Sequence, residues 1–396
     1  MTKITDVKTF FVHGQLATEV HNERTRNWIF VKVYTDDGFE GIGECVNQGS
    51  RTDLATGEVI KGYRRWLLGK DPTMITYNRQ ALVCSSGFPL GAIDMTALSG
   101  IEVALWDILG KKCGVPVYKL LGGPCRDKIR VYTHLFHHGK TGTLEELAET
   151  ASKVVKKGYN AVKIDPNPPN FGKKDPDLIK KEVFERVKAV RDAIGEDVLL
   201  CVDYCGTEFS PANVIKMAQA IEPLNPFFLE EPVLSDNIGA TAEVKAKTSI
   251  PIATGERLIS IYGFRELIET KAVDIVQPDP LLCGGIRETL KIAAMAEANY
   301  ITVAPHMPYG PVGVAACVNI DSSITNFLIQ EYKPDDKPPR SEIIVEPIKL
   351  ENGYLQLPKK PGIGIELIED SFSKYPYEPF DREVTIREDG SIGFNN

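Results

Sequence analysis

The 396-residue sequence has no apolar run of the length that crosses a membrane, and its cysteines form no Cys-X-X-Cys pair. Because a transmembrane helix needs about 20 consecutive apolar residues, we expect no membrane partner. The N-terminal residues MTKITDVKTFFVHG alternate like a strand and lack the apolar core of a signal peptide. The eight cysteines are scattered, several of them within apolar runs, which favours buried, reduced thiols and a cytoplasmic location.

Positive charge and histidine are also in short supply. The chain has 46 Lys and Arg against 54 Asp and Glu, a net charge of −8, and six His. This balance argues against nucleic acid as a partner. It does not exclude a small carboxylate as substrate, because a local metal ion and a few basic side chains outweigh distant surface charge. The composition, 43% hydrophobic and 25% charged, is that of a globular protein long enough for two domains.

What the sequence does contain is a series of polar residues at the ends of successive apolar runs. Asp203, Glu230 and Glu256 each follow such a run, at nearly equal spacing. The series continues at a similar spacing with Asp279, His306 and Glu331. The spacing fits one strand, one helix and two loops. Because the carboxyl ends of parallel barrel strands meet at one mouth, where active sites are built, we expect these side chains to converge there.

The same period organises residues 126–340. Amphipathic helices, for example Leu144–Lys157, Leu178–Ile194 and Ile286–Ala298, separate apolar runs that are predicted as strands. The predicted strands are Ile129–Thr133, Ala161–Ile164, Val198–Val202, Phe227–Leu229, Ile250–Ala253, Val273–Val276, Ile301–Ala304 and Phe327–Ile329. Eight strands that alternate with helices indicate an α/β fold, a closed TIM barrel of parallel strands.

Residues 1–125 do not follow this period and predict an N-terminal α+β capping domain. It is expected to contain two antiparallel strands and a long helix, Ile4–Val12, Trp28–Tyr34 and Ile93–Lys112. The C-terminal tail, 341–396, is expected to complete this domain. Within the tail, Gly353–Leu357 and Pro361–Gly364 are predicted to return onto it.

Three carboxylates on neighbouring strands form a set of hard oxygen ligands. Such a set is suited to Mg²⁺, with Mn²⁺ as a substitute, rather than to zinc. Any one of Asp203, Glu230 and Glu256 alone is explained equally well as the N-cap of the following helix. Their shared register on three successive strands favours a metal site with one cation per subunit. Glu231 is expected to point away from the barrel axis and to pair with a helix.

Asp279 and His306 lie on the next two strand ends. A carboxylate that accepts a hydrogen bond from one ring nitrogen orients the imidazole and raises its basicity, so the pair predicts a general base. The alternative is a structural histidine whose hydrogen bonds are satisfied.

Lys163 and Asp165 alternate on one face of the second barrel strand, and this face is predicted to point into the mouth. Lys163 is then a second catalytic acid or base, or a contact for a substrate carboxylate. A structural pair between Lys163 and Asp165 is the alternative.

Five residues are predicted to bind substrate at the mouth: Asp165, His134, Arg257, Cys205 and Glu331. Of the three histidines that follow the first barrel strand, His134 is favoured over His137 and His138. Cys205 lies two residues beyond Asp203 and is expected to share its inward direction. Arg257 directly follows the third acidic strand end. For Glu331 the alternative is a helix cap.

Ordered motifs across nearly the whole chain resemble the mandelate racemase-like branch of the enolase superfamily. The motifs are Val202-Asp203-Tyr204, Leu229-Glu230-Glu231-Pro232, Thr254-Gly255-Glu256-Arg257, Gln277-Pro278-Asp279, Gly284-Gly285-Ile286, Ala304-Pro305-His306, Ala104-Leu105-Trp106-Asp107-Ile108, Leu120-Leu121-Gly122-Gly123 and Pro361-Gly362-Ile363-Gly364. The resemblance implies a modified (β/α)7β TIM barrel under the capping domain. The residues that it implies as Mg²⁺ ligands are Asp203, Glu230 and Glu256. It further implies that Asp279–His306 is the catalytic dyad and that Glu331 binds a substrate oxygen.

Within this branch, three segments are most similar to gluconate and galactonate dehydratases: Lys163-Ile164-Asp165-Pro166, Gly255-Glu256-Arg257-Leu258 and Gln330-Glu331. The resemblance implies a hydro-lyase that abstracts the proton α to the carboxylate of an aldonate-type sugar acid. A metal-stabilised enediolate then loses the 3-hydroxyl to give a 2-keto-3-deoxy acid. An epimerase or racemase, in which Lys163 and His306 act on opposite faces, and a cycloisomerase are the alternatives. A non-catalytic sugar-acid binder is the alternative from another class, although binding alone needs no oriented base.

One position departs from the family pattern. The related dehydratases typically carry His where this chain has Cys205, and a neutral thiol with a pKa of about 8.5 is a weak general acid. Either His306 performs both proton transfers, or Tyr204, Lys163 or a histidine after the first barrel strand supplies the proton. The resemblance also implies a symmetric homo-oligomer, from dimer to octamer. Loops such as 13–27 and 47–52 are expected to read the hydroxyl pattern of the sugar acid.

Overall fold

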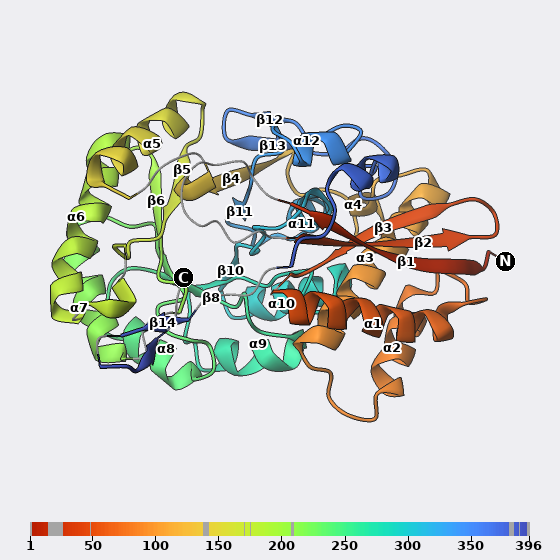
Figure 1. The fold of residues 1–396 in the computed structure, drawn as a ribbon, viewed down its shortest axis with the longest axis horizontal. Helices are drawn as coiled ribbons and strands as arrows, with labels where there is room; N and C mark the ends of the chain where they lie inside the picture. Colours follow the sequence, from red (N-terminus) through yellow and green to blue (C-terminus); the bar gives the residue numbers. More distant parts are fainter. Residues whose placement is uncertain are drawn as a thin grey trace.

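Figure 1 shows the computed structural model, in which a barrel ringed by helices lies beside a smaller module of sheet and helices. The structure describes residues 2–14, 27–47, 49–137, 142–169, 171–174, 176–206, 210–379, 384–387 and 389–393. Most of the predicted substrate loop 13–27, together with residue 48 and His138, lies outside the described residues. Among the residues that are described, no helix combines the length and the apolarity needed to span a bilayer.

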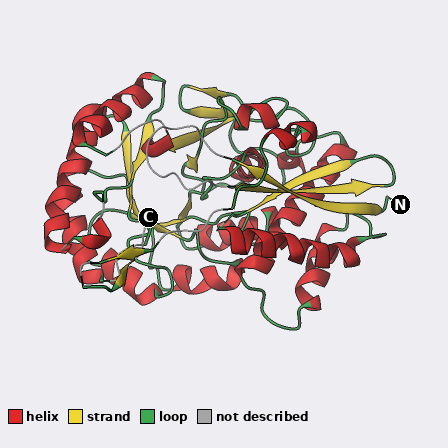
Figure 2. Ribbon diagram, viewed as in Figure 1, coloured by secondary structure: helices red, strands yellow, loops and turns green. Residues whose placement is uncertain are grey.

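The N-terminal module is a three-stranded antiparallel sheet packed against helices (Figure 2). The strands are β1 (Ile4–His13), β2 (Asn27–Thr35) and β3 (Glu40–Cys45). The helices are α1 (Ser50–Leu67), α2 (Ile75–Ser85), α3 (Ala92–Cys113) and the short α4 (Val117–Leu120). The two strands and the long helix predicted from the sequence are confirmed. Helix α3 ends at Gly114, whose φ of 68° is the left-handed conformation of a glycine C-cap.

Strand β3 lies closer to α3 than side chains allow. A Cβ built on Gly43 would lie 1.8 Å from the carbonyl oxygen of Gly100, and one on Gly41 would lie 2.0 Å from that of Ala104. Glycine is therefore required at both positions, and the strand rests directly on the helix backbone. This contact fixes the position of α3 relative to the sheet.

Residues 128–331 contain a closed barrel of parallel strands. The strands are β4 (Lys128–His134), β5 (Ala161–Ile164), β6 (Leu199–Asp203), β7 (Phe228–Glu230), β8 (Ile252–Thr254), β9 (Ile275–Val276), β10 (Thr302–Val303) and β11 (Gln330–Glu331). Each pairs in parallel with the next from β4 to β10. Strand β11 pairs with β4, and Phe327 just before it bridges to Val303 of β10, which closes the ring. The predicted barrel is confirmed, with its last strand slightly later than Phe327–Ile329.

Helices surround the barrel strands on the outside (Figure 2). They are α5 (Leu144–Lys156), α6 (Pro176–Ile194), α7 (Pro211–Ile221), α8 (Ile238–Lys245), α9 (Ser260–Glu269), α10 (Ile286–Glu297) and α11 (Pro311–Ser323). Three short 3-10 turns also occur, η1 (Leu135–His137), η2 (Phe171–Lys173) and η3 (Glu222–Leu224). Helix α5 begins with a capping box, in which Thr143 and Glu146 each accept from the other's amide.

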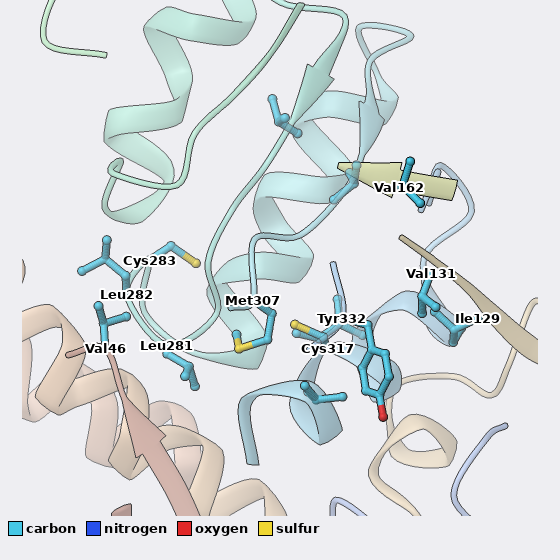
Figure 3. Packing of buried hydrophobic residues seen from close by; sticks show 14 of the residues in the cluster. Val46, Ile129, Val131, Val162, Leu281, Leu282, Cys283, Met307, Cys317 and Tyr332 are labelled. Carbon is cyan, nitrogen blue, oxygen red and sulfur yellow. The ribbon is translucent and has the colours of Figure 1, made fainter. Parts of the chain in front are cut away.

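One side chain from each strand, or from the residue directly next to it, packs inside the barrel. These side chains are Tyr132, Ala161, Cys201, Phe228, Ala253, Ile275, Ala304 and Ile329. Side chains that alternate with them, such as Val131 and Val162, pack outward in a large cluster with the helices, part of which appears in Figure 3. Because the direction of side chains alternates along a strand, the residue two positions beyond each interior residue faces the barrel axis again, nearer the mouth.

The C-terminal tail contacts both modules. Its elements are α12 (Arg340–Ile343), β12 (Leu350–Glu351), β13 (Tyr354–Gln356), η4 (Glu369–Lys374), β14 (Thr385–Ile386) and β15 (Ile392–Gly393). The amide of Val117 donates to the carbonyl of Gly362 at 2.8 Å, so Pro361–Gly364 returns onto the first module as predicted. The prediction for Gly353–Leu357 is wrong, because β13 pairs antiparallel with barrel strand β4.

An alanine at Gly43 tests the packing of β3 on α3. We expect Gly43→Ala to lower the free energy of unfolding by at least about 3 kcal/mol, because the new methyl group meets backbone that cannot move aside. The control is Gly62→Ala in α1, where the nearest atom is the end of the Arg65 side chain at 3.8 Å. Urea unfolding followed by circular dichroism measures both. Equal stability of the two variants would contradict the close packing.

Candidate active site

The residues two positions beyond the interior layer converge at the mouth of the barrel. They are His134, Lys163, Asp203, Glu230, Gly255, Gln277, His306 and Glu331. The strand register brings neighbours together, with His134 opposite Lys163 and Asp203 opposite Glu230. Every position in this set except Gly255 carries a polar side chain, so the mouth is a polar layer directly above an apolar one.

Gly255 interrupts the alternation and brings Glu256 to the mouth. Its φ is 138°, which L side chains rarely adopt, and a Cβ there would lie 2.8 Å from the ring of Phe264. The following residue would face outward on a regular strand. Here it turns inward instead, and Oε2 of Glu256 lies 3.3 Å from Nε2 of His306.

Lys163 lies among three carboxylates. Its ammonium group is 2.8 Å from Oε1 of Glu230, 3.0 Å from Oε1 of Glu331 and 3.1 Å from Oδ2 of Asp203. Burial opposes the charge on Lys163, but Glu230 and Glu331 outweigh it and hold its pKa well above the usual value. Burial and the nearby Asp203 raise the pKa of Glu230 to about 8. The mouth therefore contains more negative charge than Lys163 neutralises.

His306 and Asp279 form a hydrogen-bonded pair. Nδ1 of His306 lies 2.8 Å from Oδ2 of Asp279, and Oδ1 of Asp279 accepts from the amide of Leu281 at 2.8 Å. The other ring nitrogen, Nε2, faces Glu256 and Glu331, the latter at 4.0 Å. Burial favours the neutral ring, but Glu256 and Asp279 outweigh it and raise the pKa of His306 to about 10. The predicted pair is thus brought together in the structure, with Nε2 directed at the carboxylates.

Glu331 connects the two sides of the mouth. Its Oε1 contacts Lys163, while its Oε2 accepts from the amide of Met307, directly after His306, at 2.9 Å. Glu331 therefore contacts other residues of the mouth.

Asp203, Glu230 and Glu256 provide the donor set that a divalent cation needs. Oε2 of Glu230 is buried and has no hydrogen-bond partner among the described residues. An unpartnered carboxylate oxygen in a buried site is costly, and a hard cation is the ligand that such an oxygen prefers. Within the described parts of the chain, no three Asp, Glu, His or Cys side chains are already arranged closely enough to hold a metal ion. Lys163 contacts Asp203 and Glu230 instead, and Glu256 contacts His306. The three carboxylates are therefore suitable ligands for a divalent cation. Their side chains would have to move toward one another to bind it.

Arg257 and Glu231 form an ion pair next to Glu256. The guanidinium of Arg257 contacts Glu231, lies 2.8 Å from Oε1 of Glu256, and donates to the carbonyl of Cys205 at 3.0 Å. Glu231 does not pair with a helix, so that prediction is wrong. Its φ of 42° turns the buried carboxylate toward the end of β8, where it accepts from the hydroxyl of Thr254. A substrate contact for Arg257 stays a prediction.

Cys205 follows the end of β6 in a left-handed conformation, with a φ of 52°. Its amide donates to Oδ1 of Asp203 at 2.8 Å, so the backbone of Cys205 contacts the acidic cluster. Burial and the charge of Asp203 raise the pKa of the Cys205 thiol well above its usual value.

His134 and Asp165 lie at the ends of β4 and β5. His134 is buried, and its ring centroid lies 3.8 Å from that of Phe136. Asp165 is half-buried and accepts from the amide of Asn167 at 2.8 Å. Lys163 forms ion pairs with Asp203, Glu230 and Glu331, not with Asp165. The alternative of a structural Lys163–Asp165 pair is therefore wrong. Substrate contacts for His134 and Asp165 stay predictions; the side chain of His137 is not described.

Gln277 was not singled out from the sequence. It is fully buried, lies two residues beyond interior Ile275 and two before Asp279, and its side-chain amide makes no hydrogen bond within the described residues. The alternation of residues 275, 277 and 279 along this strand places Gln277 at the mouth.

Two family models match the chain. Residues 3–122 match the N-terminal domain of mandelate racemase / muconate lactonizing enzyme, and residues 146–371 match the enolase C-terminal domain-like family. Together the two matches span most of both modules.

Several relatives match over most of their length. The chain is 34% identical to D-galactonate dehydratase of Variovorax paradoxus over 384 residues, which cover 95% of this chain and 98% of that protein. It is 34% identical to D-xylonate dehydratase of Haloferax volcanii, with 95% and 89% covered. Among solved structures, an enolase from Agrobacterium radiobacter, bound to sodium and L-malate, has a TM-score of 0.90 at 30% identity and covers 99% of this chain and 100% of that chain.

Replacing Lys163 tests the charge balance of the mouth. We expect Lys163→Met to lower the free energy of unfolding by about 3–5 kcal/mol in chelator-treated buffer, because three buried carboxylates lose their shared cation. The control is Lys245→Met, which removes a partly exposed ion pair with Asp274 and should cost at most about 1 kcal/mol. Urea unfolding at neutral pH measures both. A Lys163 variant as stable as the control would contradict the described charge cluster.

Proposed function

The chain belongs to the mandelate racemase / muconate lactonizing enzyme family of the enolase superfamily, and we propose that it is a Mg²⁺-dependent dehydratase of an aldonate-type sugar acid. The observation that carries the proposal is the His306–Asp279 pair, which faces a lysine and several carboxylates in one barrel mouth. The relatives support the substrate class, because they are named for dehydration of galactonate and xylonate.

Members of this superfamily typically bind a divalent metal. We assign Asp203, Glu230 and Glu256 to one Mg²⁺ per subunit, with Mn²⁺ as a substitute. The partnerless Oε2 of Glu230 supports this assignment. When bound, the cation stabilises the negative charge that develops on the substrate carboxylate.

His306 is the proposed base for the α-proton. Its Nδ1 is held by Asp279, which leaves Nε2 to take a proton. Glu256 is the largest of the attractions that raise the pKa of His306. A cation held by Glu256 would weaken that attraction, which would favour the neutral ring that a base requires.

Elimination also needs a proton for the departing 3-hydroxyl. The thiol of Cys205 is a poor donor, because burial and Asp203 raise its pKa well above the usual value. Lys163 is held by carboxylates that raise its pKa in the same direction. Burial raises the pKa of Tyr204 as well. Of the donors named above, His134 and His306 are left, and we assign both transfers to His306, whose ring is held by Asp279. It takes the α-proton and returns it to the 3-hydroxyl, which leaves as water, and the resulting enol becomes the 2-keto-3-deoxy acid.

The contacts of Lys163 also bear on the epimerase alternative. An epimerase needs a second base on the opposite face of the enediolate. An ammonium group with three carboxylate contacts and a pKa well above its usual value is a poor base at neutral pH. These contacts support Lys163 as a positive contact for the substrate carboxylate rather than as a second base.

We further propose a cytoplasmic homo-oligomer, between a dimer and an octamer, whose partner is a small carboxylate rather than nucleic acid or a membrane. The eight cysteines are free thiols, which suits a reducing compartment. The loops 13–27 and 47–52 stay the predicted readers of the hydroxyl pattern.

Incubation with a panel of aldonates in D₂O tests the reaction. We expect a 2-keto-3-deoxy product from at least one acid, with activity lost after exhaustive chelation and restored by Mg²⁺. Deuterium exchange at the α-carbon without a keto product would favour the epimerase instead. Neither product nor exchange across a broad panel would contradict the proposal and favour the non-catalytic binder.

His306→Asn tests the assignment of the base. We expect turnover and α-proton exchange to fall by at least about 10³-fold, because the group that accepts the proton is gone. Mg²⁺ binding, measured by calorimetry, should persist, whereas Glu230→Gln should weaken it. Undiminished exchange in His306→Asn would transfer the role of base to another group. Exchange that persists while elimination is lost would make His306 the acid alone.

A further inference from the structure

A series of buried hydrogen bonds leads from the N-terminal module, here called the capping module, to His306 of the barrel. The amide of Val46 donates to Oγ1 of Thr96 at 2.7 Å, and the Thr96 hydroxyl donates to the carbonyl oxygen of Leu281 at 2.7 Å. The amide of Leu281 donates to Asp279, whose other oxygen holds His306. Each of these five residues is buried. Figure 3 shows Val46 close to Leu281, within one hydrophobic cluster.

Thr96 joins the two modules in this series. It lies in the second turn of α3, where its hydroxyl both accepts and donates. Threonine is a weaker helix former than Ala or Leu, and within a helix its hydroxyl often bonds a carbonyl of the same helix. Here the bond crosses to the loop after β9. Helix propensity therefore does not explain the residue, whereas the contact with that loop does.

Carboxylates of the capping module hold the helices that follow both strands of the dyad. Glu102 of α3 accepts from the first two amides of α10, at 2.7 and 3.0 Å. Glu44 of β3 accepts from two amides at the start of α11, at 2.6 and 2.9 Å. Free amides at a helix N-terminus favour such partners. The two glutamates fix the helix ends, while Thr96 holds the backbone two residues beyond Asp279.

We propose that Thr96 is a positioning residue that sets the orientation of the His306 base through Leu281 and Asp279. The catalytic part of this inference rests on the proposed function, in which His306 is the base. Proton transfer requires the ring nitrogen to be aligned with the substrate, and a small displacement is costly. Thr96 also holds Val46, directly before residues 47–52. The same hydroxyl therefore links a predicted substrate loop to the base.

Three variants separate this role from a merely structural one. Thr96→Val keeps the shape of the side chain and removes both hydrogen bonds, whereas Thr96→Ser keeps the hydroxyl. Ser99→Ala is the matched control, because Ser99 lies one turn further along α3 and accepts from the amide of Gly284 at 3.0 Å. That bond reaches the same loop but does not lie between Val46 and His306. Thr96→Ala replaces the valine variant if the latter does not fold.

The kinetic measurement uses the full-length protein with Mg²⁺ and the aldonate that it turns over. We expect Thr96→Val to lower kcat and α-proton exchange by about tenfold to a hundredfold. KM should stay within about twofold, because the interaction acts on the transition state rather than on substrate binding. Thr96→Ser should recover most of the activity. Ser99→Ala should keep the wild-type kcat even where its melting temperature falls as far as that of Thr96→Val.

A second measurement does not depend on any substrate. In protein labelled with ¹⁵N-histidine and saturated with Mg²⁺, the ring signals of His306 are assigned by their loss in His306→Asn. We expect the Nδ1 chemical shift to change in Thr96→Val and to stay at the wild-type position in Thr96→Ser and Ser99→Ala. A change confined to the valine variant supports the inference, because a general loss of stability affects the control as well.

The two measurements distinguish the possible failures. If no aldonate is turned over, the proposed function fails, and the ring signals of His306 still decide the role of Thr96. If Thr96→Val and Ser99→Ala have the same kcat and the same His306 signals, Thr96 is a structural residue and the inference is overturned. If the Thr96 variant raises KM alone, the hydroxyl acts on the substrate loop and not on the base, which also overturns it.

Discussion

The mouth of the barrel depends on how buried negative charge is balanced. Lys163 contacts carboxylates from three different strands, and its single charge is not enough for them. Burial and then Asp203 raise the pKa of Glu230, and Glu256 and Asp279 raise the pKa of His306 against the effect of its burial, so negative neighbours act in the same direction on both groups. A divalent cation is the electrostatic counterpart of this surplus, and the relationship to enolases leads to it independently. Both arguments apply to Oε2 of Glu230, a buried carboxylate oxygen that has no hydrogen-bond partner among the described residues.

The sequence predicts most of this arrangement because barrel strands are short and their side chains alternate. An apolar interior residue such as Cys201 or Phe228 is followed two positions later by Asp203 or Glu230. The spacing of the runs then places these acids on neighbouring strands, and the parallel register brings them to one end. The local sequence pattern therefore predicts the fold class. It also predicts which strand end carries each candidate site residue.

The remaining features depend on backbone reversals and distant contacts, which a periodic pattern does not contain. Glu256 enters the mouth because Gly255 has a positive φ, and Glu231 turns toward β8 for a similar reason. Both residues break the rule that places their neighbours. The pairing of β13 with β4 and the contact of Thr96 with Leu281 join segments that lie far apart in the sequence. Such contacts are specified by packing of the whole chain, so no single segment predicts them.

The two halves of the mouth are held in different ways. The carboxylate cluster is built on β5, β6, β7 and β11 and is tied together within the barrel through Lys163. The loops after β9 and β10, which carry Asp279 and His306, are held by side chains of the capping module. A shift of that module would therefore act first on Asp279 and His306, and it would reach the charge cluster through Glu331, which accepts from the amide of Met307. Cys205 belongs to the barrel half of this division, because it follows β6 directly and its amide donates to Asp203.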